Sequence, residues 1–480
     1  MNSKSLGARK FTVSDQRWFA AFSGDFNPIH MDPIAARRLL FGGVIAHGVH
    51  AALWALQLHL QSLPPPERRI ARIRCRFIRP ILLDQKVAVS RTCTESGVVS
   101  LQVFRGDTVL LLVEVQAGGA APAIESAVVS ASLARSQSCR DRQFAELAGA
   151  IGHLPLFLDL TESRTSFAAV LASLGSSRLA GIAALSRLVG MECPGMHSVF
   201  SNFAIDFLPQ SEDPTCDPML SYRVERADTA LAPIRIELTG PAMRGTVTAF
   251  YRPKPQLQAD MQAVSRLVKP GECAGQRVLV IGGSRGLGEV AAKIIACGGG
   301  HPIITFHSGE ADAQQVQQEI VAAGGRCEVL RMDVLRPRRP FAELRRRHVT
   351  LTHLYFFATP RITRAKAAVY EPGRLRDFMA YYVDSFYNVC QLASQIATGL
   401  RVFYPSTAFL DEGTRDNPEY LIAKAAGEAL CCHLARFGSE LSIHVKRLPR
   451  IATDQTATIL NGGAVNALET MLPIVREMTP

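Results

Sequence analysis

The sequence predicts two successive α+β repeats followed by an α/β domain built on a doubly wound parallel sheet. Three observations favour this fold class. A long apolar helix followed by four strands occurs twice before residue 255. From Gln276 onward, short apolar strands alternate with helices, a pattern typical of parallel sheets. The length of 480 residues suits about three domains of roughly 150 residues each.

The first repeat is expected over residues 1–123. It begins with an amphipathic helix over 12–22 and a long apolar helix over 43–60, which three prolines at 64–66 terminate. Hydrophobic patterning then predicts strands at 70–79, 86–93, 98–105 and 108–116.

The second repeat is expected over 124–255 and has the same layout. A helical, linking stretch at 125–155 leads to an apolar helix over 179–190. Predicted strands follow near 197–207, 219–226, 233–239 and 244–251. The shared order of elements suggests an internal duplication.

The third domain is expected over 272–480, after a linker at 253–272 that contains proline and lysine. Helices separate its strands, which is the pattern of a doubly wound sheet. The predicted strands are 277–283, 301–306, 326–333, 352–358, 401–406 and 443–448.

The composition predicts a cytoplasmic protein that binds neither nucleic acid nor a membrane. Eleven cysteines include no Cys-x-x-Cys pair and no metal-ligand spacing, so reduced thiols and no metal are expected. Residues 1–10 lack the apolar segment of a signal peptide, and no apolar run approaches the ~20 residues that span a membrane. No basic platform interleaved with aromatic residues suggests nucleic-acid binding.

Arginines concentrate at two places in a chain whose net charge is +11. Arg72, Arg74 and Arg76 alternate with apolar residues and so form one basic face of a strand. A second concentration lies at 336–347. Such a face is either simply solvated or docks an acidic partner or a phosphate-bearing substrate.

A glycine-rich turn joins the first strand of the third domain to the following helix. The missing side chains at Gly282, Gly286 and Gly288 let a phosphate approach the backbone, and the helix N-terminus offers it N–H groups. The pattern therefore predicts a dinucleotide site. Three further residues complete the expected turn: Ser284, Arg285 and Leu287.

The end of the second strand of this domain bears on the choice of nucleotide. An acid there would bind a ribose diol, but the strand ends in His307 and Ser308. Arg285 in the glycine-rich turn can pair with a 2′-phosphate. NADPH is therefore the preferred cofactor over NAD.

Tyr420 and Lys424 lie four residues apart and share one face of a predicted helix. A lysine ammonium beside a phenol lowers the pKa of the phenol, so Tyr420 can donate a proton near neutral pH. Ser406 or Thr407, at the end of the preceding strand, can hold a substrate carbonyl.

With these motifs in this order, residues 276–480 resemble the short-chain dehydrogenase/reductases, which have a Rossmann-type fold. The resemblance implies that Tyr420 is the catalytic acid and that Lys424 adjusts its pKa and binds the nucleotide ribose. It also implies that a hydroxyl group holds the substrate carbonyl. The spacing to Tyr420 favours Thr407 for this role, whereas the residue type favours Ser406. Further implied cofactor contacts are Asp333, Val334 and Ala358.

The chain departs from that family at several positions. Ile281 stands where the family has threonine, and residues 356–359 replace its Asn-Asn-Ala-Gly segment. Tyr382 aligns near its helix-four asparagine, and Pro449-Arg450 replaces Pro-Gly. These differences affect the expected proton relay and substrate lid more than the nucleotide-binding turn.

A second constellation lies in residues 22–32, FSGDFNPIHMD. Asp25 and His30 occur in a turn-rich loop that can aim both groups at one point, where one activates water and the other moves a substrate proton. The long apolar helix starts at Ile45–Gly48, and its first N–H groups, including that of Gly48, can bind a thioester oxygen as negative charge develops.

The string Ser-Gly-Asp-x-Asn-Pro-x-His-x-Asp resembles the signature of MaoC-type (R)-specific enoyl hydratases/dehydratases. The resemblance implies Asp25 and His30 as a catalytic dyad and Asn27 as an orienting residue. It also implies the hot-dog fold, in which an antiparallel sheet wraps a long helix, and thus a double hot-dog followed by a Rossmann-type domain. The repeat at 160–253 lacks this string and is expected to be a non-catalytic partner that shapes an acyl pocket.

Together the two resemblances imply a bifunctional enzyme that acts on an acyl thioester of acyl carrier protein or coenzyme A. One domain would reduce a 3-oxoacyl group to 3-hydroxyacyl with NADPH, and the other would remove water to give the enoyl group, or add it. Two alternatives stay open: a hydratase joined to a nucleotide-bound but inactive reductase, and a non-catalytic carrier-binding module. Both families usually associate, so a homodimer is expected.

Overall fold

The computed structural model describes residues 4–39, 41–93, 98–118, 138–209, 218–229, 232–252, 254, 256–360, 362, 370–413, 417–437, 441–453 and 464–479. The chain divides into two compact units, Met1–Lys254 and Pro255–Pro480. The expected boundary at 123 and residues 125–137 of the predicted stretch 125–155 lie outside the described residues.

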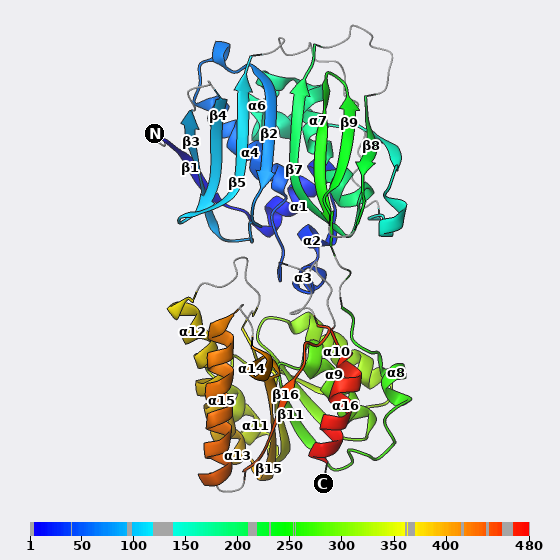
Figure 1. The fold of residues 1–480 in the computed structure, drawn as a ribbon, viewed down its shortest axis with the longest axis vertical. Coiled ribbons are helices and arrows are strands. Elements are labelled where there is room, and N and C mark those ends of the chain that lie inside the picture. The colour runs from blue at the N-terminus through cyan, green and yellow to red at the C-terminus, as the bar shows by residue number, and fades with distance from the viewer. Residues whose placement is uncertain are drawn as a thin grey trace. The chain divides into compact units, whose positions relative to one another are not determined.

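The first unit is built on one antiparallel sheet of ten strands, in the order β1-β3-β4-β5-β2-β7-β10-β9-β8-β6 (Figure 1). From each edge inward, β1, β3, β4, β5 and β2 correspond to β6, β8, β9, β10 and β7, so the two halves have the same topology. Strands β2 and β7 pair at the seam between the halves. The strands are β1 Lys4–Lys10, β2 Ile70–Phe77, β3 Lys86–Cys93, β4 Val98–Arg105, β5 Thr108–Ala117, β6 Ile151–Pro155, β7 Ser198–Phe207, β8 Met219–Arg226, β9 Ile234–Gly240 and β10 Met243–Tyr251.

In Figure 1 the long helices of this unit lie behind the sheet, while the short helices α2 and α3 lie beyond its lower end. Each half contributes one long buried helix, α4 (Gly48–Gln61) and α7 (Ser176–Arg187), and apolar residues of both halves form one continuous core. A π-helical turn, η3 (Leu188–Glu192), continues α7. The other helices are α1 Val13–Ser23, α2 Pro28–Met31, α3 Pro33–Arg37, α5 Leu160–Ser166 and α6 Ala168–Leu174, with short 3-10 turns η1 Pro65–Glu67 and η2 Phe144–Glu146.

The predicted long helix at 43–60 starts later than expected, at Gly48. The preceding residues are held extended, because the Ala46 N–H donates to the Ile81 carbonyl (2.8 Å) and Ile45 bridges to Leu82. Strands β1 and β6 were not predicted, and β6 falls in a stretch expected to be helical. Both lie at the edges of the sheet, where little apolar alternation marks a strand.

The second unit is a six-stranded parallel sheet in the order β13-β12-β11-β14-β15-β16. In chain order this is 3-2-1-4-5-6, the arrangement of doubly wound dinucleotide-binding sheets. Ligands bind such sheets where the strand order reverses, here at the carboxyl ends of β11 and β14. The strands are β11 Arg277–Ile281, β12 His301–Phe306, β13 Glu328–Arg331, β14 Leu351–Phe356, β15 Ala397–Thr407 and β16 Leu441–Leu448.

Helices cover both faces of this parallel sheet (Figure 1). Apolar residues of α9, α10 and α16 pack on one face, and those of α11, α13 and α15 pack on the other. The helices are α8 Met261–Ser265, α9 Gly286–Cys297, α10 Glu310–Ala322, α11 Arg338–Arg346, α12 Pro372–Met379, α13 Phe386–Ser394, α14 Phe409–Glu412, α15 Pro418–Phe437 and α16 Ala467–Met478, with a π-helical turn η4 at Ala380–Ser385.

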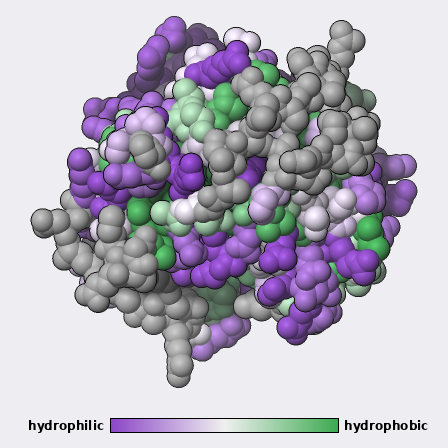
Figure 2. Space-filling view, turned by 90° about the horizontal axis from the view of Figure 1, so that it is seen from above, coloured by the Kyte–Doolittle hydropathy of each residue, from purple (hydrophilic) through white to green (hydrophobic). Residues whose placement is uncertain are grey.

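Within the described residues, no single helix is long and apolar enough to cross a membrane. The sharply bent pair made by α6 and the segment Ser176–Glu192 passes by length and composition, but its residues lie largely in the core of the first unit. The face of the molecule seen in Figure 2 is mostly hydrophilic, with small separate hydrophobic areas.

Candidate active sites

Asp25 lies just after α1 and is only 2% exposed. The helix ends at Gly24, whose φ of 81° turns the chain toward the sheet interior. Asp25 Oδ1 accepts the Asn27 N–H (3.1 Å), and Oδ2 accepts the hydroxyl of Ser186 on α7 (2.6 Å). Burial raises the pKa of Asp25, and His30 and these hydrogen bonds oppose that shift. The carboxylate is therefore held by both halves of the unit.

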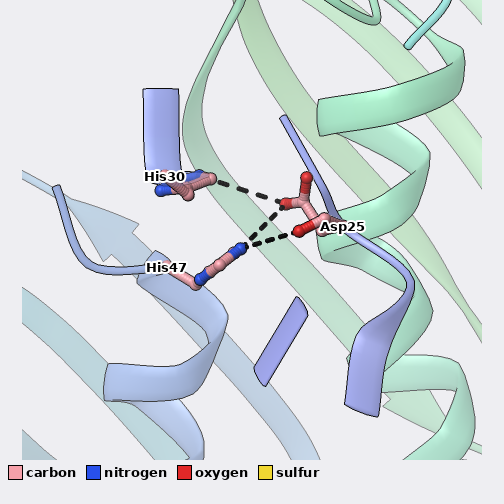
Figure 3. A group of neighbouring side chains, drawn as sticks. All are labelled: Asp25, His30 and His47. Atoms are coloured by element: carbon pink, nitrogen blue, oxygen red, sulfur yellow. Dashed lines mark hydrogen bonds and ion pairs between the residues drawn. The ribbon is translucent and has the colours of Figure 1, made fainter. Parts of the chain in front are cut away.

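His30 faces Asp25 from α2, as Figure 3 shows. Its Nδ1 lies 2.8 Å from the Ile45 carbonyl oxygen, which can only accept, so Nδ1 carries the hydrogen in the neutral ring. The lone pair is then on Nε2, which lies 4.0 Å from Asp25 Oδ2. Burial lowers the pKa of His30, against the opposing effect of Asp25.

His47 completes the group in Figure 3, and its side chain was not predicted to take part. Its ring stacks on that of His30, with centroids 3.9 Å apart. Its Nδ1 lies 2.9 Å from Gln16 Oε1, and its Nε2 lies 2.9 Å from the Asp25 carbonyl oxygen. Burial lowers the pKa of His47 well below its usual value, so the neutral ring donates to only one of these oxygens.

The side chains of Asp25, His30 and His47 are close enough together to suggest a cation site, since their ligand atoms lie within 4.8 Å of one another. Each ring nitrogen of His47, however, already faces an oxygen atom. To bind a metal ion, His47 would have to give up the partner of the coordinating nitrogen, which is the Asp25 carbonyl oxygen for Nε2. The arrangement fits a group that positions the Asp25 loop better than it fits a metal ligand.

Asn27 ties the loop to the second half of the unit. Its side-chain N–H donates to the Gly190 carbonyl (2.7 Å), and its side-chain oxygen accepts the Ile29 N–H and caps α2. Gly190 belongs to η3, and a Cβ atom there would lie 2.3 Å from Asp25 Oδ1. Only glycine therefore lets η3 approach the carboxylate this closely.

A cavity of about 210 Å³ opens beside this group. Asp25 and His30 are at its wall together with Gly48, the first residue of α4. The rest of the wall is mainly apolar and comes from both halves, including Phe77, Ile81, Leu111, Val189 and Phe200. A Cβ atom at Gly48 would lie 2.6 Å from the Phe77 ring, so packing requires glycine here.

The glycine-rich turn of the second unit joins β11 to α9 as predicted. Gly282 and Gly286 have φ angles of 78° and 59°, which favour glycine. A Cβ atom at Gly288 would lie 2.3 Å from the Gly282 carbonyl oxygen, whereas one at Gly286 would meet nothing closer than 3.7 Å. The turn is thus tightly packed at Gly288, while a Cβ atom at Gly286 would make only ordinary contact with Thr453. Ser284 is buried, and Arg285 and Leu287 lie at the start of α9.

The residues predicted at the adenosine end lie close together at neighbouring strand ends. His307 and Ser308 are exposed just after β12, and His307 Nδ1 lies 4.0 Å from Asp333 Oδ1. Asp333 also accepts the Leu335 N–H (3.0 Å), while Val334 is buried. Ala358 follows β14, and the preceding Phe357 N–H donates to the Ile281 carbonyl (2.8 Å).

Tyr420 and Lys424 lie on α15, opposite the end of β15. A hydrogen bond joins the Thr407 and Tyr420 side chains, while Ser406 lies beside Glu428 and helps, after Arg447, to lower the pKa of that residue. Of the two predicted hydroxyls, Thr407 is therefore the one beside Tyr420. Burial raises the pKa of Tyr420 to about 12, and the Thr407 hydrogen bond offsets this only in part.

The surroundings of Lys424 differ from the expected ones. Its Nζ donates to the Pro405 carbonyl (2.6 Å) and lies 4.0 Å from the ring centre of Tyr382, but 5.9 Å from that of Tyr420. Burial lowers the pKa of Lys424 to about 7. Tyr382 in turn is hydrogen-bonded to Thr359. The expected lowering of the Tyr420 pKa by Lys424 is therefore not found.

Several residues at these sites escaped sequence reasoning. Ser186 and Gly190 lie in a repeat without a recognisable motif, and Gln16 lies inside an ordinary amphipathic helix, so no local signal marks them. His47 was noticed only as part of the string that starts the long helix. Tyr382 was noticed as a difference from the short-chain dehydrogenase/reductase pattern. The presence of this tyrosine is the sequence feature that could have indicated the changed surroundings of Lys424.

We expect Gly190→Ala to destabilise the first unit. The new Cβ would overlap Asp25 Oδ1, and relieving such overpacking typically costs about 1–3 kcal/mol. Urea unfolding measures the loss. Gly43→Ala is the control, because its Cβ would meet Leu82 at an ordinary 3.7 Å. Equal stabilities of the two variants would contradict the packing described here.

We expect Lys424→Met to alter the pH dependence of stability. Between pH about 7 and about 10.4 the unfolded chain keeps a proton on Lys424 that the folded protein has released, so wild-type stability rises with pH in this window. The methionine variant lacks this contribution. Urea unfolding at several pH values should show that the free energy of unfolding of wild type increases relative to that of Lys424→Met as pH rises. A constant difference, like that expected for exposed Lys446→Met, would refute the burial of the charge.

A family model and one curated relative match part of this chain. The family model of the MaoC like domain matches residues 4–115. Over 74 residues the chain is 39% identical to 3-hydroxyacyl-thioester dehydratase X of Mycobacterium tuberculosis, an alignment that covers 15% of this chain and 25% of that protein. The chain thus matches only a quarter of the length of that relative.

Among solved structures, a short chain dehydrogenase from Burkholderia cenocepacia in complex with NADP is 20% identical, over 44% of this chain and 92% of that one, with a TM-score of 0.39. A 3-oxoacyl (acyl-carrier-protein) reductase from Agrobacterium tumefaciens with NADP bound is 23% identical, over 38% of this chain and 74% of that one, with a TM-score of 0.35. The assignment of the parallel sheet rests on its own strand order. The family match identifies residues 4–115 as a MaoC-like domain.

Proposed function

We propose that the first unit is a double hot-dog hydratase/dehydratase that interconverts an enoyl thioester and a 3-hydroxyacyl thioester. The observation that carries this proposal is the 4.0 Å gap between His30 Nε2 and Asp25 Oδ2 at the wall of a mainly apolar cavity. A water molecule placed between these atoms would lie within hydrogen-bonding distance of both. The apolar wall suits the acyl chain of a substrate.

The dyad can act as a base and an acid in one step. Ile45 directs the lone pair of His30 to Nε2, and burial lowers the pKa of His30 while it raises that of Asp25. In hydration, His30 takes a proton from water as its oxygen adds to C3, and Asp25 delivers a proton to C2. The proton on His30 then returns to Asp25. Dehydration runs the same steps backwards.

The start of α4 is suited to the thioester oxygen. The first N–H groups of a helix have no acceptor within the helix, and the helix dipole favours negative charge there. Gly48 is the first residue of α4 and lines the cavity at this point. We assign its N–H to the oxygen on which charge develops while the proton at C2 moves.

We further propose that the second unit reduces a 3-oxoacyl thioester with NADPH as cofactor. The residues fit a dinucleotide, because the glycine-rich turn has positive φ angles at Gly282 and Gly286 and α9 begins directly after it with its N-terminal N–H groups. A bound nicotinamide would supply the hydride. Thr407 would orient the substrate carbonyl, and Tyr420 would donate the proton to its oxygen. The thioester carrier is coenzyme A or an acyl carrier protein.

A second candidate for this unit is nucleotide binding without reduction. The position of Lys424, turned toward Pro405 and Tyr382, and the pKa of Tyr420, raised to about 12, favour it. The two candidates differ in one measurable respect. Both predict that NADPH binds and changes its fluorescence, but only the reductase oxidises NADPH with a 3-oxoacyl thioester.

Single substitutions should separate the two activities. We expect Asp25→Asn to lower the kcat of crotonyl thioester hydration by about 10²- to 10⁴-fold, because it removes one member of the proton-transferring dyad. Tyr420→Phe should similarly reduce only NADPH oxidation. Exposed Asp107→Asn is the control for charge loss. Loss of both activities in either variant would contradict two separate sites, and a fully active Asp25→Asn would refute the hydratase proposal.

Ser186→Ala tests whether the second half supports the dyad. The Ser186 hydroxyl lowers the pKa of Asp25, so its removal should raise that pKa further. Because the active dyad shares one proton, the alkaline limb of the kcat/KM profile for hydration should move to higher pH, with kcat reduced by about tenfold. Ser177→Ala on the same helix is the control. An unchanged pH profile would contradict this role.

A further inference from the structure

Beside the cavity of the first unit lies a second hollow that the proposed function does not use. This hollow has a volume of about 650 Å³ and is lined by residues 74–78, 112, 114 and 201–204. We call it the arginine groove. Two residues, Phe77 and Ile78, line both the groove and the cavity. The two hollows are therefore adjacent at the end of β2.

The alternation of side chains along β2 places the groove on the sheet face opposite the helices. Ile73 and Cys75 are fully buried, whereas Arg74 and Arg76 between them are exposed. The ring of Phe77 packs against Gly48 at the cavity. The chain thus passes from two exposed arginines to the cavity wall within a few residues.

The charges of the groove are unbalanced. Arg72, just outside it, is paired with Asp206, but no described carboxylate forms an ion pair with Arg74, Arg76 or Arg79. Arg79 lines the catalytic cavity beside Ile78. Glu114 lies opposite Arg74 in the strand register and is the one carboxylate in the groove lining. The groove and the adjoining wall therefore carry an excess of positive charge.

We infer that the arginine groove binds the phosphate of the 4′-phosphopantetheine arm of the substrate while the thioester lies between Asp25 and Gly48. This inference rests on the proposed hydratase function. It follows from the shared wall of groove and cavity at Phe77 and Ile78, and from the guanidinium groups of Arg74 and Arg76, which match a phosphate in charge and geometry. Coenzyme A and acyl carrier proteins share this phosphate, so the groove serves either carrier.

The spacing of the arginines agrees with this role. Arg74 and Arg76 are two residues apart on one strand face, which separates their Cα atoms by about 7 Å. Two long, flexible guanidinium side chains at this spacing can reach one phosphate group from two sides. The negative charge of Glu114 opposes phosphate binding and so limits its affinity.

The test compares ligands with and without the phosphate. Binding of coenzyme A, 4′-phosphopantetheine and pantetheine is measured by calorimetry for wild type and for the double variant Arg74→Gln/Arg76→Gln. We expect the variant to bind the two phosphate-bearing ligands at least about tenfold more weakly than wild type does, which corresponds to about 1.4 kcal/mol. Both proteins should bind pantetheine with the same affinity. Added salt should weaken phosphate-dependent binding in wild type but not in the variant.

Two further substitutions sharpen the test. Glu114→Gln should strengthen coenzyme A binding about two- to threefold, because it removes the opposing charge from the groove. Arg223→Gln on β8 is the matched control: Arg223 is exposed on the same sheet but four strands from β2, or about 19 Å away. It should leave all three affinities unchanged.

Turnover separates this inference from the hydratase proposal. With crotonyl thioesters of coenzyme A, 4′-phosphopantetheine and an acyl carrier protein, the double variant should raise KM and keep kcat, whereas the crotonyl thioester of pantetheine should be unaffected. If binding depends on the phosphate but no thioester is hydrated, the hydratase proposal is refuted while the inference about the arginine groove is retained. Three results for the double variant would overturn the inference: an unchanged affinity for the phosphate-bearing ligands, an equal loss of affinity for pantetheine, or a loss of affinity for coenzyme A alone.

Discussion

The burial of one carboxylate at the seam between two halves is the constraint on which the first unit depends. Asp25 is nearly inaccessible to water, so its charge and its orientation depend on the hydrogen bonds that reach it. One of these comes from Ser186 in the second half, and Gly190 in the same half leaves the room that the carboxylate needs. Neither half alone can therefore form the site.

This dependence explains why the second repeat persists without a motif of its own. Ser186 near the end of its long helix, and Val189 and Gly190 in the π-helical turn that follows, lie at the cavity wall. Such turns occur mostly where function requires an irregular helix. The second repeat thus supplies packing, hydrogen bonds to Asp25 and Asn27, and part of the cavity wall.

In the second unit the corresponding constraint is the burial of Lys424. An ammonium group without a carboxylate partner is costly inside a protein, and here the Pro405 carbonyl and the rings of Tyr382 and Tyr404 surround it. This arrangement couples the lysine to Tyr382. The glycine-rich turn follows a different strand, β11.

The sequence predicted those features that local patterns encode. Strands such as 98–105 and 301–306 match the structure because apolar periodicity and burial agree there. The edge strands β1 and β6 and the late start of α4 were missed, since pairing with distant residues decides them. Likewise, Asp25 and His30 stand in one readable string, whereas Ser186 and Gln16 reach the same site only through tertiary packing. The choice between Ser406 and Thr407 depends on which side chain points toward Tyr420, and the spacing of residues in the sequence does not determine this.

A crystal structure with bound 3-hydroxybutyryl coenzyme A would test the central claim most directly. The account predicts the 3-hydroxyl oxygen between Asp25 Oδ2 and His30 Nε2, with the thioester oxygen at the Gly48 N–H. A ligand bound in the first unit with its hydroxyl away from both side chains would contradict the account, and so would a ligand found only in the second unit.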